Sequence, residues 1–328
     1  MNAAIPATMR AAVRTAYGTP ESITIAEVPV PQPKADELLV RVRATTVNRT
    51  DCANLTGKPL VMHLVLGIGT PRTSRIGTDF AGEVVAVGEA VEGYSVGDRV
   101  CGFRDTGLGS QAEYLTVRAD GPVMIAVDGL SYAEMAASLE GAHYAYAMVR
   151  RTKVRPGARV MINGATGAIG SALLQFTAAL GAEITVTARE EDRDTVRRLG
   201  ARTVIDYLRT DFTRTSQRFD YVFDAVGKSA FGKCRHLLHE EGVYLSSEAG
   251  PYLQNVGYSL LTPLRRGRKV RFPIPYPTEE SFPFIRRHLT GGTFRPLLDV
   301  REFTLGEVRD AYSYVLGGQK RGNVILYP

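Results

Sequence analysis

The feature that most constrains this chain is a glycine-rich turn between an apolar segment and a helical pattern. The apolar residues 160–162 indicate a buried strand, and the run NGATGAIG that follows places glycine at positions 164, 167 and 170. Such glycines permit a tight turn and a close backbone approach, while the start of the helix offers unpaired N–H groups and a favourable dipole to a pyrophosphate. This order predicts a dinucleotide-binding Rossmann unit. The alternative is a tight strand-to-helix turn without a ligand.

A regular alternation of strands and helices surrounds this turn. Apolar strands are predicted at 158–162, 184–188, 204–205 and 221–226, with a helix at 167–180. Strands separated by helices are typical of a parallel sheet covered on both faces. Ser131 followed three residues later by Glu134 is a capping-box pattern, and we expect it to open the first helix of this second domain.

The N-terminal part has a different texture. Short β-type stretches at 38–47, 80–87, 98–103 and 112–117 are separated by glycine and proline, which predicts an all-β lobe shaped as a distorted barrel. A chain of 328 residues is also long for a single core. We therefore predict a catalytic domain at 1–130, a nucleotide-binding domain at 131–274, and a return segment at 275–328 that completes the first domain.

Composition narrows the cellular setting. No apolar run approaches the roughly 20 residues of a membrane span, the opening residues lack a signal-peptide pattern, and the three cysteines are scattered. We expect a cytoplasmic protein with reduced thiols and no membrane partner. The net charge of +6 is dispersed apart from the basic run 265–269. That run lacks interleaved aromatic residues, so we interpret it as a solvated loop and regard nucleic-acid binding as the weaker alternative.

The end of the second strand of the nucleotide-binding domain indicates the cofactor. An acidic residue there would bind the adenosine ribose and repel a 2′-phosphate, but this sequence has Arg189. NADPH is therefore predicted in preference to NADH. Glu190, Glu191 and Asp192 follow and argue the other way, although carboxylates also favour the first turn of a helix. Arg193 is left open between a phosphate contact and a solvated position.

Several further motifs carry a family resemblance. They are GTDFAGEVVAVGEAVEGYSVGDRV from Gly77, GSQAEYLTV from Gly109, RRLGARTVIDY from Arg197 and FDAVGKSAFGKCRHLL from Phe223. With the glycine turn, they make nearly all of the chain resemble the quinone oxidoreductase branch of the medium-chain dehydrogenase/reductase superfamily. The resemblance implies an α/β protein in which a GroES-like β-barrel catalytic domain accompanies a doubly wound Rossmann domain, with the nicotinamide between them.

The chain departs from the zinc-dependent members of that superfamily. Asn48 stands where they have a cysteine ligand, and Thr78 and Asp79 stand in place of a histidine and a glutamate. Cys101 has no cysteine neighbours, so the structural zinc loop is missing too. The resemblance then implies a zinc-independent enzyme that transfers hydride to an activated small-molecule acceptor, a quinone or an α,β-unsaturated carbonyl.

Candidate site residues follow from the turn and from the resemblance. Asn48 and Asp51 are the candidate catalytic residues, with a turn-forming asparagine and a helix N-cap as their structural alternatives. Tyr207 matches a tyrosine that helps hold the adenosine phosphate, or it belongs to the core. The candidate cofactor-binding residues are Asn163, Gly164, Ala165, Thr166, Gly167, Ala168, Ile169, Gly170, Arg189, Tyr207, Ala225, Val226, Gly227, Leu245 and Ser246.

Two departures leave the acceptor open. Ala53 replaces a tyrosine common in the branch, and Tyr144-Ala145 replaces its usual Thr-Ala pair. Two alternatives therefore stay beside the quinone or enone reductase: an enoyl reductase acting on a carrier-bound or specialised-metabolite intermediate, and a non-catalytic NADPH-binding sensor or scaffold. The resemblance also implies a homodimer joined edge to edge through residues 270–274.

Overall fold

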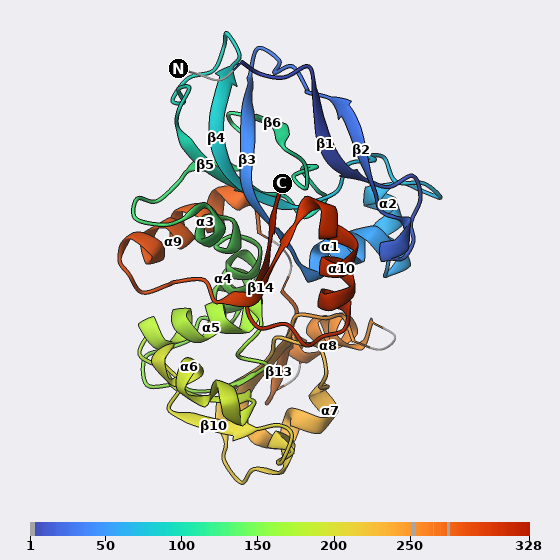
Figure 1. Ribbon diagram of the computed structural model, residues 1–328. Coiled ribbons are helices and arrows are strands. Elements are labelled where there is room, and N and C mark those ends of the chain that lie inside the picture. The colour runs from blue at the N-terminus through green and yellow to red at the C-terminus, as the bar shows by residue number, and fades with distance from the viewer. Residues whose placement is uncertain (1–3, 251–252, 265, 274–275) are drawn as a thin grey trace. The chain divides into compact units, whose positions relative to one another are not determined.

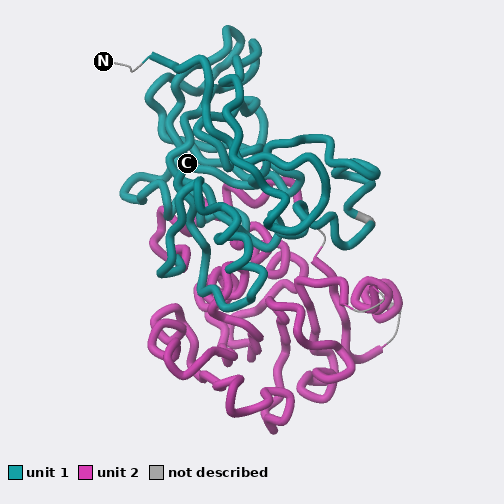
Figure 2. Tube along the Cα trace, turned by 45° about the vertical axis from the view of Figure 1, so that its right-hand side comes forward, with its two compact units in different colours: residues 1–140, 298–328 teal, residues 141–297 magenta. Residues whose placement is uncertain are grey.

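A computed structural model describes residues 4–250, 253–264, 266–273 and 276–328. The chain forms two compact units, which are coloured separately in Figure 2. Unit 1 contains residues 1–140 and 298–328, and unit 2 contains residues 141–297. Within the described ranges, no helix has both the length and the apolar character that a membrane span requires.

Unit 2 is built on a six-stranded sheet in the order β10-β9-β8-β11-β12-β13. Every neighbouring pair runs parallel, which confirms the predicted alternation. The strands, labelled in part in Figure 1, are β8 (Arg159–Asn163), β9 (Glu183–Ala188), β10 (Thr203–Asp206), β11 (Phe219–Asp224), β12 (Leu238–Ser246) and β13 (Lys269–Arg271).

The helices of unit 2 pack on this sheet by their apolar faces. Helices α5 and α6 contact β8, β9 and β10, whereas α7 and α8 contact β12 and β13. Gly181 and Gly200 follow α5 and α6 with positive φ angles, as C-cap positions require. The bounds are α4 (Glu140–Thr152), α5 (Ala168–Ala179), α6 (Arg193–Arg198), α7 (Phe231–Cys234), α8 (Gln254–Leu261) and α9 (Thr278–Thr290), with 3₁₀ turns η3 (Glu190–Asp192), η4 (Phe212–Arg214), η5 (Arg235–Leu237) and η7 (Thr262–Leu264).

Unit 1 contains the predicted all-β lobe. Its seven-stranded sheet has the order β14-β15-β3-β4-β5-β7, with β6 paired to β3, and β1 pairs separately with β2. The strands are β1 (Thr8–Val13), β2 (Thr24–Pro29), β3 (Glu37–Val47), β4 (Asp79–Val87), β5 (Arg99–Phe103), β6 (Tyr114–Arg118), β7 (Val123–Ile125), β14 (Leu298–Thr304) and β15 (Asn323–Tyr327). Residues 298–328 of the predicted return segment join this sheet, since β15 pairs antiparallel with β3, whereas the part of that segment before residue 298 belongs to unit 2.

Short helices join and cover these strands. They are η1 (Pro20–Ser22), α1 (Arg49–Thr56), η2 (Leu60–Met62), α2 (His63–Leu66), α3 (Tyr132–Ala137), η8 (Leu305–Glu307) and α10 (Val308–Leu316). A buried apolar cluster that includes Leu55, Tyr312 and Leu326 ties α1, α10 and β15 together. The C-terminal elements α10 and β15 therefore pack against α1, the helix that follows β3.

The units divide after residues 140 and 297, where the sequence analysis placed boundaries at 130 and 274. The Ser131–Glu134 capping box is present, but the helix it opens, α3, contacts β3 and β4 and so belongs to unit 1. Helix α9 belongs to unit 2. The hydroxyl oxygen of Ser281 in α9 lies 2.8 Å from Nδ1 of His143 in α4. Both unit boundaries therefore depend on contacts between residues that are distant in sequence: those of α3 with β3 and β4, and those of α9 with α4.

Candidate functional site

The glycine turn between β8 and α5 requires glycine at two of its three positions. Gly164 has a φ of +88°, and a Cβ built there would lie 2.4 Å from Val226 Cγ1. A Cβ on Gly170 would lie 2.0 Å from the carbonyl oxygen of Gly164. These two glycines therefore let the first turn of α5 pack directly against the end of β8.

Gly167 differs from the other two glycines. It is the N-cap of α5, it has a φ of −79°, and no side chain caps the helix there. A Cβ built on it would have only the carbonyl oxygen of Gly164 nearby, at 3.7 Å. Space above the backbone is therefore open at the helix N-terminus, which is the arrangement a pyrophosphate needs. Ala165 and Ala168 are buried around it, whereas Thr166 and Ile169 are half-buried.

Side-chain hydrogen bonds connect the carboxyl ends of three strands beneath the turn. Asn163 Nδ2 donates to Asp224 Oδ1 at 3.0 Å, and Thr187 Oγ1 donates to Asn163 Oδ1 at 2.8 Å. The Thr187 hydroxyl oxygen also accepts from the backbone N–H of Gly164 at 2.8 Å. Asn163 thus links the end of β8 to β11 and, through Thr187, to the backbone of the glycine turn. The sequence analysis did not include Thr187 among the site residues. The signal for it was a hydroxyl-bearing residue near the end of the mainly apolar run ITVTA.

The other candidate cofactor-binding residues lie at the ends of β11 and β12. The backbone N–H of Ala225 donates to Asn163 O at 3.0 Å, and Gly227 has a φ of +67°. Val226 packs against Gly164, as its distance from a built Cβ shows. Leu245 and Ser246 are both buried, so Leu245 can present only its backbone to a ligand.

Arg189 and Tyr207 come together at the ends of β9 and β10. Arg189 Nε donates to the Tyr207 hydroxyl at 2.9 Å, and Arg189 Nη1 lies 3.4 Å from Glu191 Oε1. Tyr207 is 46% exposed, so its alternative interpretation as a core residue is wrong. The pair forms a partly exposed cationic corner on unit 2.

The acidic run after Arg189 is engaged locally. Both carboxylate oxygens of Glu190 accept from the Arg193 guanidinium, which also donates to Val204 O at 3.5 Å. Arg193 is therefore partly exposed and paired with Glu190, which agrees with the solvated position of the two that were left open. Arg189 contacts only one carboxylate oxygen of its partner Glu191, at 3.4 Å, so more of its guanidinium stays available to a ligand than in Arg193.

The two candidate catalytic residues form the start of α1 in unit 1. Asn48 is the N-cap and Asp51 is the third helical residue of a reciprocal capping box. Asn48 Oδ1 accepts from the Asp51 N–H at 2.8 Å, and Asp51 Oδ2 accepts from the Asn48 N–H at 3.1 Å. Both residues are 2% exposed. The N-cap role considered for Asp51 belongs to Asn48.

The amide of Asn48 is directed into the protein. Its Nδ2 donates to Thr78 Oγ1 at 2.8 Å and lies 3.2 Å from Asp79 Oδ2. Asp79 also accepts from the hydroxyl and the backbone N–H of Thr46 at 2.6 and 2.8 Å. Burial raises the pKa of Asp79 to about 6, against the opposing effect of these hydrogen bonds. We call Thr46, Asn48, Asp51, Thr78 and Asp79 the polar cluster of unit 1.

This donor set does not fit a catalytic zinc ion. Zinc sites use cysteine, histidine and carboxylate ligands in a tetrahedron, and the cluster has one carboxylate, one hydroxyl and one amide at the corresponding positions. Moreover, Asn48 presents N–H donors to Thr78 and Asp79, so the three side chains satisfy one another. Zinc binding here would break these hydrogen bonds, and the amide and hydroxyl groups that became free are weak zinc ligands.

One further carboxyl group, that of Glu140, is buried near the start of α1. Thr50 Oγ1 donates to Glu140 Oε1 at 2.9 Å, and burial raises the pKa of Glu140 to about 7. The pKa of Asp51 is raised by burial and then by the charge of Asp79. Among the described residues, Asp51 Oδ1 has no hydrogen-bond partner. Sequence analysis missed Glu140, because a glutamate at a helix start is ordinarily a solvated dipole partner.

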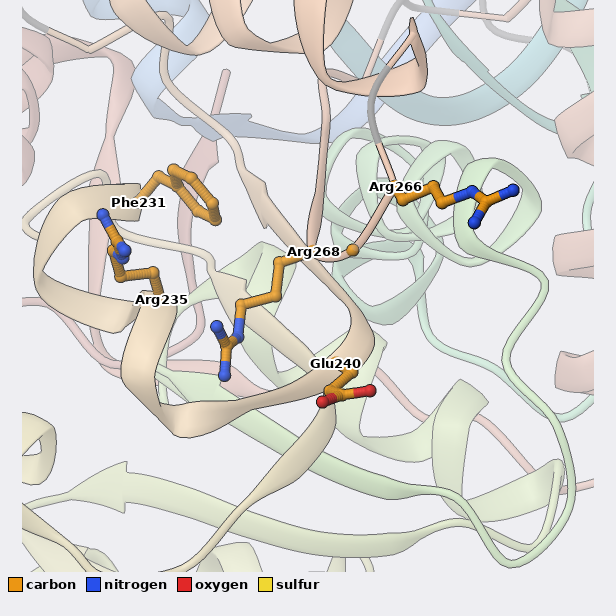
Figure 3. A pocket seen from close by; sticks show the side chains of 6 residues that line it. Phe231, Arg235, Glu240, Arg266 and Arg268 are labelled. Carbon is orange, nitrogen blue, oxygen red and sulfur yellow. The ribbon is translucent and has the colours of Figure 1, made fainter.

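The basic run after α8 contributes to a pocket on unit 2 (Figure 3). Arg266 and Arg268 line a volume of about 480 Å³ with Phe231, Arg235 and Glu240, and Arg265 lies outside the described residues. In Figure 3 the Arg266 side chain points away from the other labelled side chains. Because Glu240 and Arg268 lie toward the amino ends of β12 and β13, this pocket is at the end of the sheet opposite to the glycine turn.

Two family models match the chain. The family described as "Alcohol dehydrogenase GroES-like domain" matches residues 34–127, and the family described as "Zinc-binding dehydrogenase" matches residues 199–326. The quinone oxidoreductase structure from Coxiella burnetii is similar to this chain with a TM-score of 0.84 and 22% identity, covering 98% of this chain and 99% of the other. At that identity the likeness shows the fold.

Curated relatives cover most of the chain. A trans-enoyl reductase of Aspergillus terreus is 32% identical over 281 residues, covering 80% of this chain and 75% of the relative. A 2-methylene-furan-3-one reductase of Solanum lycopersicum is 28% identical, covering 99% and 80%. An NADPH-dependent alkenal/one oxidoreductase of Arabidopsis thaliana, named as chloroplastic, is 26% identical, covering 100% and 81%.

Proposed function

Because the chain belongs to the medium-chain dehydrogenase/reductase superfamily, in its quinone-oxidoreductase-like branch, we propose that it reduces quinones or α,β-unsaturated carbonyls with NADPH and without zinc. It is an oxidoreductase that uses a nicotinamide cofactor and a small-molecule substrate. The observation that carries the proposal is the open glycine turn together with the cationic corner of Arg189 and Tyr207.

The residues of unit 2 fit the cofactor. The uncapped N-terminus of α5 and the space above Gly167 suit the pyrophosphate. Arg189 suits the 2′-phosphate, because its Nε is fixed by Tyr207 while its guanidinium stays partly exposed. The relative from Arabidopsis thaliana is named as NADPH-dependent, which supports the same preference. When bound, the reduced nicotinamide supplies the hydride that the acceptor receives.

The residues of unit 1 determine what the protein contributes to the reaction. Without a Lewis acid, the acceptor has to be electron-poor already, and catalysis rests on positioning and on hydrogen bonds to the oxygen that gains charge. Asn48 and Asp51 are buried and hydrogen-bonded to each other. We therefore assign them a positioning role, in which they fix the first turn of α1 and the hydroxyl of Thr78. Direct contact of either residue with the acceptor stays a prediction.

An enoyl reductase is the second candidate function. The relative that is 32% identical is named a trans-enoyl reductase, and hydride transfer to an enoyl thioester has the same requirements as transfer to an enone. The two functions differ in the group that carries the acceptor, so a comparison of free and thioester-bound substrates separates them.

The decisive experiment follows NADPH oxidation by the purified protein across three acceptor groups: quinones, short free enones and enoyl thioesters. We expect turnover with at least one of the first two groups. Turnover with thioesters alone would select the enoyl reductase. NADPH binding without oxidation in any group would select the sensor or scaffold instead.

Zinc independence is tested in the same assay. We expect the rate to be unchanged after prolonged treatment with a zinc chelator, and elemental analysis to find far less than one zinc per chain. Loss of activity that is restored by added zinc would contradict this part of the proposal.

The cytoplasmic location stays a prediction. The relative from Arabidopsis thaliana is named as chloroplastic. Imaging of the tagged full-length chain in its own cell type checks it directly.

A further inference from the structure

A second cationic pocket lies on unit 1, next to the segment that contains Thr78, since the backbone N–H of its lining residue Arg104 donates to Thr78 O at 2.8 Å. It has a volume of about 450 Å³ and is lined by the segment 72–75, the loop that contains Arg104 and Gly109, and part of β6. The size is within the range of small-molecule sites. Its lining residues belong to unit 1, whereas every residue of the candidate dinucleotide site belongs to unit 2.

Arg75 is held at the wall of this pocket by its neighbours. The backbone on either side is fixed to β1, because Arg14 N donates to Ser74 O at 2.8 Å and Ile76 N donates to Ala12 O at 3.3 Å. A Cβ built on Gly109 would lie 3.0 Å from Arg75 Cβ and 3.5 Å from its Nε, so the side chain runs closely past this glycine. The backbone and the aliphatic part of Arg75 are therefore preorganised.

The charge of Arg75 is not compensated within the protein. Its side chain is half-buried, and burial lowers the pKa of its guanidinium. In the described part of the chain, no carboxylate or hydrogen-bond acceptor contributes to this shift, and burial is its only cause. No nitrogen of Arg75 is among the fully buried unpartnered atoms, so its guanidinium is open to solvent and available to an anion.

The surrounding side chains add to this positive charge. Arg72 and Arg104 also line the pocket, and neither forms an ion pair with a described residue. The fourth arginine, Arg118, differs because it pairs with Asp120 at 2.8 Å and lies 3.6 Å from Asp36. The one carboxylate in the lining, Glu37, accepts from the backbone N–H of Lys34 at 3.1 Å.

We propose that Arg75, with Arg72 and Arg104, binds the phosphate group of a small organic phosphate. Guanidinium groups bind phosphate through paired, charge-assisted hydrogen bonds, and the hydroxyls of Thr73 and Ser74 in the same lining supply neutral donors. The pocket exceeds what one phosphate needs, which leaves room for an organic part. This site is independent of the proposed reductase function.

The test is calorimetric titration of the full chain with inorganic phosphate and with pyrophosphate, at about 0.15 M salt so that long-range surface attraction is screened. NADPH is present in excess to fill the dinucleotide site. We expect saturable binding of one anion per chain, a loss of at least tenfold in affinity in Arg75→Gln, and an intermediate loss in Arg75→Lys. Arg104→Gln, an exposed position with little effect on folding, should weaken binding about threefold.

Arg235→Gln is the matched control, because it removes one exposed arginine from the arginine-lined pocket of unit 2 shown in Figure 3. It should leave anion affinity unchanged within twofold. An equal loss in Arg235→Gln and Arg75→Gln would mean diffuse charge attraction and would overturn the proposal. A loss confined to Arg189→Gln would place the anion at the dinucleotide site and overturn it equally, as would the absence of saturable binding.

Discussion

At the scale of single residues, the cofactor preference depends on how two neighbouring arginines are paired. Arg189 is held by Tyr207 and lies near one oxygen of Glu191, whereas Arg193 binds both carboxylate oxygens of Glu190. A guanidinium engaged in a two-point ion pair has little left to offer a phosphate. The two residues therefore differ in function although they are close in sequence and carry the same charge.

The predicted consequence is a difference between two substitutions of equal charge. Arg189→Gln should raise the Kd for NADPH at least tenfold while changing the Kd for NADH less than threefold, because only NADPH has the 2′-phosphate. Arg193→Gln should change neither Kd more than threefold. Fluorescence titration of both cofactors measures this, and equal losses for NADPH and NADH in Arg189→Gln would refute the assignment.

A second residue-scale prediction concerns Glu140. The residue is 3% exposed, and burial raises the pKa of its carboxyl group from 4.5 to about 7. The folded state therefore retains this proton while the unfolded chain releases it, so the contribution of Glu140 to stability falls as pH rises from about 4.5 to 7 and is constant above that range. Glu140→Gln keeps an acceptor for Thr50 and removes the titration.

We expect the free energy of unfolding of Glu140→Gln, relative to the unsubstituted protein, to rise by up to about 3 kcal/mol between pH 5 and pH 8. Urea unfolding at the two pH values measures this difference. The exposed Glu92 provides the control, since Glu92→Gln should show no such change. A stability difference for Glu140→Gln that is the same at both pH values would contradict a buried, titrating carboxyl group.

At the scale of elements, the turn between β8 and α5 separates glycines needed for folding from one needed for binding. Gly170→Ala places a Cβ against the Gly164 carbonyl oxygen, so it should lower both the Tm and the affinity for NADPH. Gly167→Ala has open space and an ordinary φ, so it should keep the Tm within a few degrees. Its methyl group would nevertheless occupy the approach to the helix N-terminus, and the Kd for NADPH should rise about tenfold.

Thermal unfolding and cofactor titration of the two variants provide the test. Unchanged NADPH affinity in Gly167→Ala would show that the pyrophosphate does not approach the backbone there. A stable Gly170→Ala protein would show that α5 can move away from β8 at little cost, contrary to the close packing of the turn.

At the scale of the whole molecule, the free edge of the unit 2 sheet is the proposed dimer contact. β13 ends the sheet and has one neighbour, β12, among the described strands, while Ile274 at the end of the predicted interface lies outside the described residues. Helix α8 contacts β13 and exposes Leu260 and Leu261. Exposed apolar side chains beside an unpaired strand edge favour association with a second copy.

Light scattering should therefore find a dimer for the unsubstituted protein and a monomer for Leu260→Asp. Leu208→Asp is matched to it, since both leucines are 70% exposed and Leu208 follows β10 at the other edge of the same sheet. This control should remain dimeric. A monomeric unsubstituted protein, or dissociation by the two substitutions alike, would contradict the proposed interface.

The sequence by itself determined features that depend on adjacent residues. The glycine turn, the alternation of strands and helices, Arg189 at a strand end and the missing zinc ligands are local patterns, and local backbone preference and periodicity suffice to recognise them. Tertiary structure decided the contacts between residues distant in the chain: the Asn163–Thr187–Asp224 link, the inward amide of Asn48, the buried Glu140 and the unpaired Arg75. These contacts depend on which strands become neighbours, and the burial of each side chain depends on which elements cover it. Both are decided only when the chain adopts its tertiary structure.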